Sequence, residues 1–266
     1  MPNQDLKITR FFREHLTAGM IMTDLDLDLD GSKTVDEGIE YLSVARYDLV
    51  ILRVGDNHKY VALGALQEFA RKKPGNGSVA LNARAKEFPS TRIVSSDMPI
   101  RSAADALSKG SFPLLVAGQE GPAFILTKSD FASPAGIAAA LLLAALVDSL
   151  LDRELQRKDA EAVLAALETE VVDRLRRQFK TKQQWEEELD IISLMNLGSR
   201  FIAFNACFEP VCSQNDAEWL TKQRNELSHG RLENVTGEDL LKFIIQMDDI
   251  FVKLSGETTE GGSAGV

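Results

Sequence analysis

Two side chains near the carboxyl end of the chain have types and spacing that suit phosphodiester chemistry. They lie in the run Arg224-Asn225-Glu226-Leu227-Ser228-His229-Gly230. An arginine can bind a phosphate through two parallel hydrogen bonds and keeps its charge at any working pH, whereas a histidine exchanges protons near neutrality. Arg224 and His229 are therefore a candidate catalytic pair. A structural alternative stays open, in which both residues only lie at the end of a helix and have no catalytic role.

The residue after His229 predicts how this pair is held. Gly230 is a typical helix stop, so it places His229 in the last turn, where the negative end of the helix dipole favours the protonated imidazole. Asn225 and His229 are four residues apart and share a helix face. Arg224 and His229 are five residues apart and diverge by about 140° on a regular helix. They converge only if the last turn loosens or a second subunit supplies the opposing surface, so we expect a homodimer.

Composition limits the kinds of function that this pair could serve. The 266 residues, 44% of them hydrophobic, predict one large or two modest domains with packed cores. A net charge of −10 and a pI near 4.9 argue against a broad nucleic-acid-binding surface and leave room only for a narrow one. Cys207 and Cys212 lack the companions of a zinc site and are expected to be reduced core thiols. No metal site is predicted.

The ends and the apolar runs of the sequence predict a cytoplasmic protein without a membrane span. The first residues show no basic segment followed by an apolar one, so no signal peptide is expected. The most apolar run, Ala135 to Val147, is thirteen residues long, whereas a bilayer span needs roughly twenty. We interpret it as a buried helix.

The amino-terminal half is predicted to contain two small α/β repeats about sixty residues apart. In the first, a capping box at Thr34 and Glu37 starts a helix, which is followed by a strand, a turn and a second strand. A further helix starts at about Ala65. The second repeat has the same order, with strands at 92–94, 112–117 and 123–127 and a helix over 102–109.

The residues within these elements resemble those of the tandem CBS domain pair. In the second copy, Ile93-Val94-Ser95-Ser96-Asp97-Met98-Pro99-Ile100 is similar to the family's entry strand and loop, and Phe112-Pro113-Leu114-Leu115-Val116 to its second strand. The run Phe124 to Asp130 resembles the closing strand with its Thr-x-x-Asp signature, here Thr127 and Asp130. The resemblance covers roughly residues 6–133, with copies at about 6–73 and 79–133.

That resemblance implies a binding site for an adenine nucleotide or a related messenger as a regulatory ligand. Thr127 would face the phosphate, and the carboxylate of Asp130 would accept hydrogen bonds from the ribose hydroxyls. A helix beginning after Thr127 would present free N–H groups to an anion. Met22, Ile93 and Pro113 would line the same site. An alternative for Asp130 is a charge at the start of a helix, with no ligand.

The first copy departs from this pattern, so we expect one ligand site at most. Gly64 and Gln67 stand where the Thr and the Asp would be. The acidic run from Asp24 to Asp30 alternates strictly with leucine. Strict alternation is more typical of a half-exposed strand or an extended loop than of a cation site.

From Ser133 and Pro134 onward the sequence predicts only helices, so the domain boundary is placed at 133/134. Pro134 suits the first turn of a long helix. Apolar residues at three-and-four spacing between Val163 and Leu175 predict a second helix, and further helices are expected over 187–205, 215–229 and 237–254. The tail after residue 256 is rich in Gly, Thr and Glu and is expected to be disordered.

One basic segment interrupts an otherwise acidic half. Residues 134–266 hold 14 Lys plus Arg against 23 Asp plus Glu, a net −9. Five cations nevertheless fall within nine residues, and they could contact an RNA backbone: Arg174, Arg176, Arg177, Lys180 and Lys182. The alternative is a solvated helix end near the favourable pole of its dipole.

The run Arg224, Asn225 and His229, at a helix end in an all-α region, resembles the Arg-polar-x-x-x-His motif of the HEPN family. The resemblance covers roughly residues 134–255 and implies a metal-independent endoribonuclease that acts as a dimer, or an inactive binding module. In the active case, the RNA 2′-hydroxyl would attack the adjacent phosphorus while Arg224 stabilises the phosphoryl oxygens and His229 moves protons. Asn225 would orient His229 or a phosphate oxygen.

Together these patterns predict an α+β protein: a tandem CBS pair followed by a HEPN-like bundle of four to five helices. The expected function is a nucleotide sensor that gates cleavage of single-stranded RNA, in defence or stress response. The alternative is a non-catalytic sensor whose helical domain binds a protein partner or only dimerises. No cofactor is required in either case.

Overall fold

The structure is a computed structural model that describes residues 13–24, 29–45, 47, 49–54, 57–110, 112–118, 121–184 and 190–256. Its contacts divide the chain into two compact units, neither of which is continuous in sequence. The sheet unit comprises residues 22–96 and 112–127, and the helical unit comprises 1–21, 97–111 and 128–266. The chain therefore passes between the units several times, and the helix over 100–108 groups with the helices that follow it.

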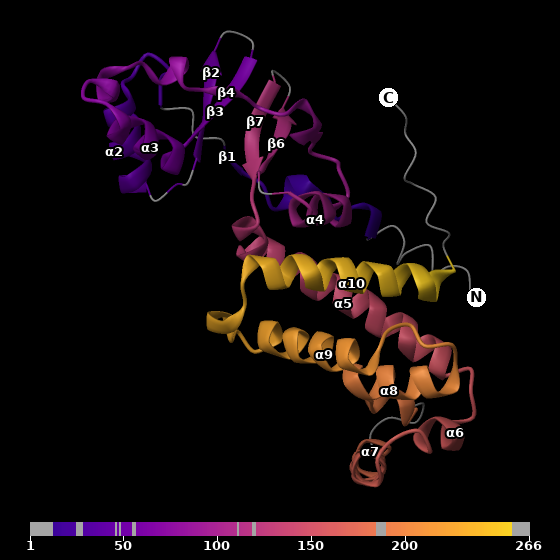
Figure 1. The fold of residues 1–266 in the computed structure, drawn as a ribbon. Helices are drawn as coiled ribbons and strands as arrows, with labels where there is room; N and C mark the ends of the chain where they lie inside the picture. Colours follow the sequence, from indigo (N-terminus) through magenta and orange to yellow (C-terminus); the bar gives the residue numbers. More distant parts are fainter. Residues whose placement is uncertain are drawn as a thin grey trace. The chain divides into compact units, whose positions relative to one another are not determined.

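The first layer of the sheet unit is a three-stranded antiparallel sheet covered by two helices (Figure 1). The strands are β2 (Leu49–Val54), β3 (Asn57–Ala62) and β4 (Lys86–Glu87), and the helices are α2 (Val35–Ala45) and α3 (Leu63–Lys72). Successive strand residues point to opposite faces, so Val50 and Leu52 pack under the helices with Leu42 and Leu66. The predicted capping box starts α2, because the N–H of Thr34 donates to Glu37 Oε2 at 2.7 Å.

The second sheet has the order β1-β7-β6-β5. Its strands are β1 (Thr23–Asp24), β5 (Ile93–Ser95), β6 (Leu114–Gly118) and β7 (Gly121–Leu126). The pair β5 and β6 is parallel, and the other two pairs are antiparallel. The opposite face of β2 contributes Ile51, which packs with Phe88 and Leu115 of β6. This small core joins the two sheets within the unit.

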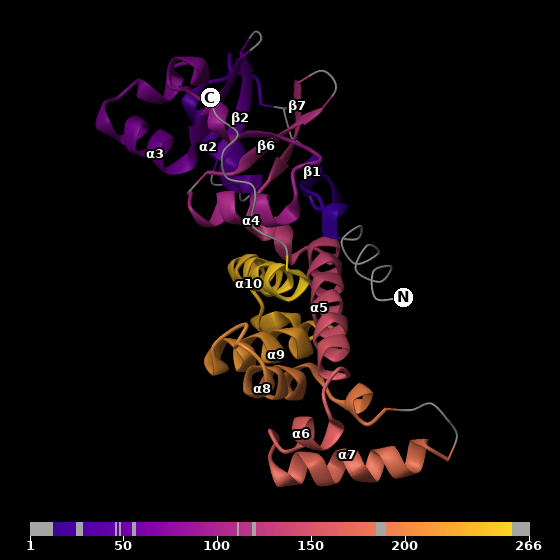
Figure 2. The same ribbon diagram turned by 90° about the vertical axis from the view of Figure 1, so that its right-hand side faces the viewer.

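The helical unit is built around α5 (Pro134–Leu155). Figure 2 shows α8 (Leu197–Cys207), α9 (Gln214–Ser228) and α10 (Gly237–Ser255) stacked at its side. The other face of α10 packs on α4 (Ile100–Ser108). Two shorter elements, α6 (Ala160–Leu164) and α7 (Thr169–Lys182), lie beyond the carboxyl end of α5. The 3-10 turns are η1 (Ala18–Met20), η2 (Asn76–Ser78), η3 (Leu81–Ala83), η4 (Ser90–Arg92), η5 (Ser129–Ala132), η6 (Ile192–Leu194) and η7 (Leu232–Asn234).

The helix α5 is longer than the apolar run that predicts it. Its 22 residues are long and apolar enough to cross a membrane by length and composition alone, yet half of its most apolar window is buried within the structure. Ser133 caps its first turn by accepting a hydrogen bond from the N–H of Gly136 at 3.2 Å. Asp148 and Asp152, in the carboxyl-terminal half of α5, form ion pairs with Arg200 of α8. These contacts are those of a central helix in a bundle.

Two of the predicted helices are wrong in extent. Residues 190–196 are not part of a helix running from 187 to 205, because Asn196 is extended and its side chain caps α8 by accepting from the N–H of Ser199. The apolar face from Val163 to Leu175 is divided between α6 and α7, because Glu168 adopts an extended conformation between them. A pattern of apolar residues cannot register such a break, since the same residues stay buried on either side of it.

Two predictions fall wholly or partly outside the described residues. The tail 257–266 lies outside them, and so do residues 25–28 of the alternating acidic run. At the end of that run, Leu29 is buried and Asp30 accepts a hydrogen bond from the N–H of Ser32 at 2.8 Å, a local turn. Within the described ranges, no group of three or more His, Cys, Asp or Glu residues could hold a metal ion.

Candidate functional site

The helix α9 carries the predicted catalytic residues and ends where the sequence predicts. Ser213 caps its start by accepting from the N–H of Asp216 at 3.1 Å. At the other end the N–H of His229 donates to the carbonyl of Asn225 at 3.0 Å, and Gly230 follows with φ of +67°. Only glycine adopts that left-handed conformation without strain, so Gly230 stops the helix and leaves His229 exposed at its end.

Arg224 and His229 line different cavities, which lie on different sides of α9. His229 and Asn225 line an open groove of about 890 Å³ between α8, α9 and the start of α7. Arg224 lines a smaller cavity of about 350 Å³ on the α5 side of α9, where its Nη1 donates to Asn225 Oδ1 at 3.2 Å. The divergence expected from their spacing is present, so one chain does not direct both side chains into one cavity.

The cavity of Arg224 holds two carboxylates and a second arginine that the sequence pattern did not single out. Arg200 of α8 is 7% exposed, and its Nη1 and Nη2 lie 2.7 and 2.9 Å from carboxylate oxygens of Asp148 and Asp152. Burial raises the pKa of Asp152, although the charge of Arg200 opposes that shift. The only sequence signal for this cluster is the four-residue spacing of the two acids on an apolar helix. The cluster joins α5 to α8, which gives Arg200 a structural role.

The groove of His229 holds two cations that sequence reasoning also missed. Lys222 and Arg231 line it beside His229, as does the exposed side chain of Ile202. Arg231 follows the glycine stop, and its N–H donates to the carbonyl of Glu226 at 2.9 Å, which fixes the chain reversal. Three carboxylates, those of Glu168, Glu218 and Glu226, line the same groove, and Glu226 lies 3.9 Å from Lys222. The imidazole can transfer a proton, and Arg231 can bind a phosphate.

The five cations of the basic segment all fall on α7. Arg176 pairs with Glu161 of α6 at 2.8 Å, while Arg177 and Lys182 line a shallow cavity of about 550 Å³ beside Ser193. Lys180 and Lys182 are in the last turn, where cations favour the helix dipole. This placement agrees with the alternative of a solvated helix end, and an RNA contact by Arg174 and its neighbours stays a prediction.

Four of the five predicted nucleotide-binding residues lie at one end of the four-stranded sheet. Thr127 directly follows β7 and Met22 directly precedes β1, and the register Thr23 to Ile125 brings these two ends together. Pro113 directly precedes β6, whose Leu114 pairs with Leu126. Ile93 opens β5, which runs parallel to β6 with Ile93 opposite Leu115. The fifth residue, Asp130, is in η5 and belongs to the helical unit.

A half-buried cation at this end of the sheet was not predicted. Arg92 directly precedes β5, and its Nη2 donates to the carbonyl of Phe112 at 2.6 Å. Burial lowers the pKa of its guanidinium, which nevertheless stays charged at neutral pH. The hydrogen bond holds the chain just before Pro113 against the start of β5.

Comparison with known proteins finds similarity at the level of solved structures. No protein-family model matches the chain, and no curated protein matches it significantly. The solved structures that resemble its amino-terminal part are consistently proteins with CBS domains. They include AcuB from Vibrio cholerae, described as an acetoin utilization protein, which is 17% identical with a TM-score of 0.41 over 54% of this chain and 96% of its own.

Two further matches are named as nucleotide complexes. CBSX2 in complex with AMP is 21% identical, with a TM-score of 0.35 over 43% of this chain and 91% of its own. The CBS domain of a bacterial CNNM/CorC family Mg²⁺ transporter in complex with ATP is 14% identical, with a TM-score of 0.38 over 49% and 94%.

Proposed function

We propose that this protein is a regulatory sensor that binds an adenine nucleotide at the end of the β1-β7-β6-β5 sheet. The observation that carries the proposal is the strand register, which gathers Met22, Ile93, Pro113 and Thr127 at that end. Residues from both halves of the sheet unit thus meet at one place. Ligand sites of α/β proteins are commonly found where strand ends converge.

Each of these residues has a chemical part in the proposed site. The hydroxyl of Thr127 donates to a phosphate oxygen, and Asp130 accepts from the ribose hydroxyls. Ile93 is 37% exposed and offers apolar surface to the adenine ring, whereas Pro113 is buried and fixes the chain before β6. The backbone at Met22 supplies polar contacts. Arg92 adds a positive charge for the phosphates.

Chain connectivity provides the route from this site to the helices. The helix α4 connects β5 to β6 in sequence but belongs to the helical unit, where it packs on α10. A ligand held at the starts of β5 and β6 contacts the end of that connection that leads into β6. The signal requires that the nucleotide bind two arrangements of α4 with different affinity.

For the helical unit we propose endoribonuclease activity on single-stranded RNA, in a cytoplasmic defence or stress response. The favouring observation is that His229, Lys222 and Arg231 line one groove. His229 would move protons while the cations hold the phosphate, and Arg224 would join them only from the second subunit of a homodimer. No step in this scheme needs a metal ion.

A non-catalytic effector is the second candidate, and the cavity of Arg224 favours it. In that cavity a phosphodiester would meet the carboxylates of Asp148 and Asp152, which already pair with Arg200. The groove of His229 adds three glutamates, which also disfavour a phosphodiester. In this case the helical unit docks a protein partner or only dimerises, and the nucleotide changes that interaction.

Calorimetry with AMP and ATP tests the sensor. Binding to the wild type should be saturable, and Thr127→Ala and Asp130→Ala should each weaken it by about tenfold through loss of a hydrogen bond to a charged or hydroxyl group. Thr169→Ala and Asp173→Ala, at exposed positions of α7, are the matched controls. Unchanged affinity in both site variants would remove the nucleotide from this end of the sheet.

Incubation with labelled single-stranded RNA, with and without nucleotide, separates the two effector functions. Cleavage that is lost in a folded His229→Ala variant and leaves a 2′,3′-cyclic phosphate supports the ribonuclease. Intact RNA under every nucleotide condition favours the non-catalytic effector.

A further inference from the structure

The sheet unit contains a second cavity, whose lining shares no residue with the proposed nucleotide site, although its Phe112 directly precedes Pro113. It has a volume of about 350 Å³ and lies between α3, β3 and β4. The position of α3 beside these strands is visible in Figure 1. It lies on the first repeat, where Gly64 and Gln67 replace the expected Thr and Asp, and neither of these two residues lines it.

The floor of this cavity is aromatic. Tyr60 of β3 and Phe112 contact each other edge to face, with ring centroids 4.9 Å apart, and Phe69 of α3 adds a third ring to the lining. All three side chains are partly exposed. Such a surface can stack against a flat or apolar group.

The rim of the cavity is cationic in a protein of net charge −10. Lys72, Arg84 and Lys86 line it, against the single carboxylate of Glu68, which pairs with Lys72 at 2.7 Å. Lys86 stands directly across the strand pair from Tyr60, so its side chain is on the same face. Within the described part of the chain, neither Arg84 nor Lys86 has a carboxylate at ion-pairing distance.

The guanidinium of Arg84 is held in a conformation that suits anion binding. It lies over the ring of Phe69, with its central carbon 4.1 Å from the ring centroid. Stacking occupies the face of the guanidinium and leaves its in-plane N–H donors available for a two-point contact with a phosphate or carboxylate. Its rotamer is thus fixed before a ligand arrives, which lowers the entropic cost of binding.

From these contacts we infer that the α3 cavity is a second ligand site, for a small organic phosphate that carries a flat ring. The ring packs against Tyr60 and Phe112, and the phosphate lies between Arg84 and Lys86. The cavity volume is at the lower end of the range for small-molecule sites, which fits a compact ligand. The assignment does not depend on the nucleotide site at the sheet end.

Phenyl phosphate is the probe, because it has the ring and the phosphate but lacks the ribose hydroxyls that the proposed nucleotide site recognises. Binding to the ¹⁵N-labelled full chain is followed by amide chemical shifts, with phenol and inorganic phosphate as the partial probes. We expect saturable shifts at residues 60–72 and 84–86, and affinity about tenfold lower for each partial probe. Inorganic phosphate that binds as tightly as phenyl phosphate would overturn the role of the aromatic floor.

Two double variants separate the cavity from general electrostatic attraction. Arg84→Gln with Lys86→Gln should reduce the affinity for phenyl phosphate by about tenfold or more. Arg71→Gln with Lys73→Gln removes the same charge from exposed positions outside the lining and should retain binding. Equal losses in both, or no saturable shift up to about 10 mM probe, would refute the site.

Thr127→Ala distinguishes binding of the probe in the α3 cavity from binding at the proposed nucleotide site. It should leave phenyl phosphate binding unchanged. If instead it abolishes that binding, the probe occupies the sheet end and the α3 cavity is no ligand site. Circular dichroism melting of every variant confirms that the fold is retained.

Discussion

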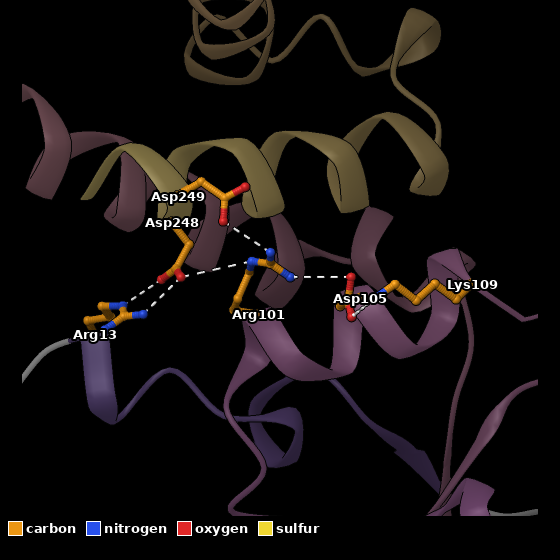
Figure 3. Close-up of polar contacts among 6 residues, drawn as sticks. All are labelled: Arg13, Arg101, Asp105, Lys109, Asp248 and Asp249. Carbon is orange, nitrogen blue, oxygen red and sulfur yellow. Dashed lines mark hydrogen bonds and ion pairs between the residues drawn. The ribbon is translucent and has the colours of Figure 1, made fainter. Parts of the chain in front are cut away.

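Asp248 of α10 accepts two hydrogen bonds from the guanidinium of Arg13, with Nε to Oδ1 at 2.6 Å and Nη2 to Oδ2 at 2.9 Å. Figure 3 shows that the same carboxylate faces Arg101 of α4, whose Nε lies 3.9 Å from Oδ2. Arg101 also donates to Asp249 at 3.0 Å and pairs with Asp105 at 3.6 Å. Charges from three separate segments thus join α4 and the segment before η1 to α10.

Removal of Asp248 should strongly destabilise the helical unit. Its side chain is only 6% exposed, so Asp248→Ala leaves Arg13 and Arg101 partly buried without their shared carboxylate. Loss of one partner of a buried ion pair costs about 3–5 kcal/mol. Urea unfolding followed by the fluorescence of Trp219, which lies in α9 of the helical unit, measures this.

The matched control for Asp248→Ala is an exposed ion pair of the same unit. Glu161 pairs with Arg176 at 2.8 Å, but the two side chains are 73% and 51% exposed. Glu161→Ala should therefore cost less than about 1 kcal/mol. A similar loss in both variants would show that the Asp248 pair contributes no more than a surface pair.

Gly237 at the start of α10 should not tolerate alanine. A Cβ there would meet the carbonyl oxygen of Lys128 and lie 3.2 Å from the Cα of Ser129, and both of these are backbone atoms that cannot rotate away. We expect Gly237→Ala to cost about 1–3 kcal/mol despite the better helix propensity of alanine. Gly64→Ala in α3, where no atom lies within 4 Å, should be neutral or stabilising. Circular dichroism melting compares the two variants, and equal melting temperatures would contradict the close approach.

Local signals predicted most of the secondary structure, and tertiary contacts account for what they missed. The capping box at Thr34, Pro134 at the start of α5 and Gly230 after α9 mark helix ends that the structure reproduces. The two-residue strand β4 has no run of β-formers, so only its pairing with β3 defines it. The grouping of α4 with α10 rests on contacts such as Arg101 to Asp249, which are 148 residues apart.

The sequence predicted the candidate sites only in part, again because tertiary contacts complete them. The i,i+5 spacing predicted that Arg224 and His229 would diverge, and they line separate cavities. The companions of His229 were not predictable, because Arg231 reaches the groove only through the chain reversal after Gly230. Arg200 is a buried residue of α8 whose ion-pair partners lie on α5, and no local sequence pattern predicts an ion pair between two helices.

The raised pKa of Asp152 predicts a pH-dependent stability difference. Burial is its main cause, so the folded protein binds a proton at Asp152 that the unfolded chain releases at about pH 4. Between that pH and the raised folded pKa, this residue lowers stability as pH rises. Asp152→Asn removes the contribution, so the stability of the variant minus that of the wild type should increase with pH across this window.

Urea unfolding at a series of pH values from about 3 to 7 measures this difference. Asp173→Asn, at an exposed position of α7, is the control for the loss of one negative charge. The increase for Asp152→Asn must exceed that of the control. A difference that falls with rising pH would mean that the charge of Arg200 outweighs burial at this carboxylate.

If the helical unit cleaves RNA, the two arginines near His229 should respond differently to mutation. Arg231 shares the groove with His229 in the same chain, whereas Arg224 faces another cavity and must act from a second subunit. Arg231→Ala and His229→Ala should each reduce the cleavage rate by about a hundredfold or more, as expected for loss of a transition-state contact. In mixtures, Arg224→Ala with His229→Ala should regain part of the activity, because a mixed dimer holds one intact pair. Arg231→Ala with His229→Ala should stay inactive. Both residues act from the same chain, so every groove of a mixed dimer lacks one of them. Recovery by the second mixture, or by neither, would refute the assignment of Arg231 to the groove in cis and of Arg224 to it in trans.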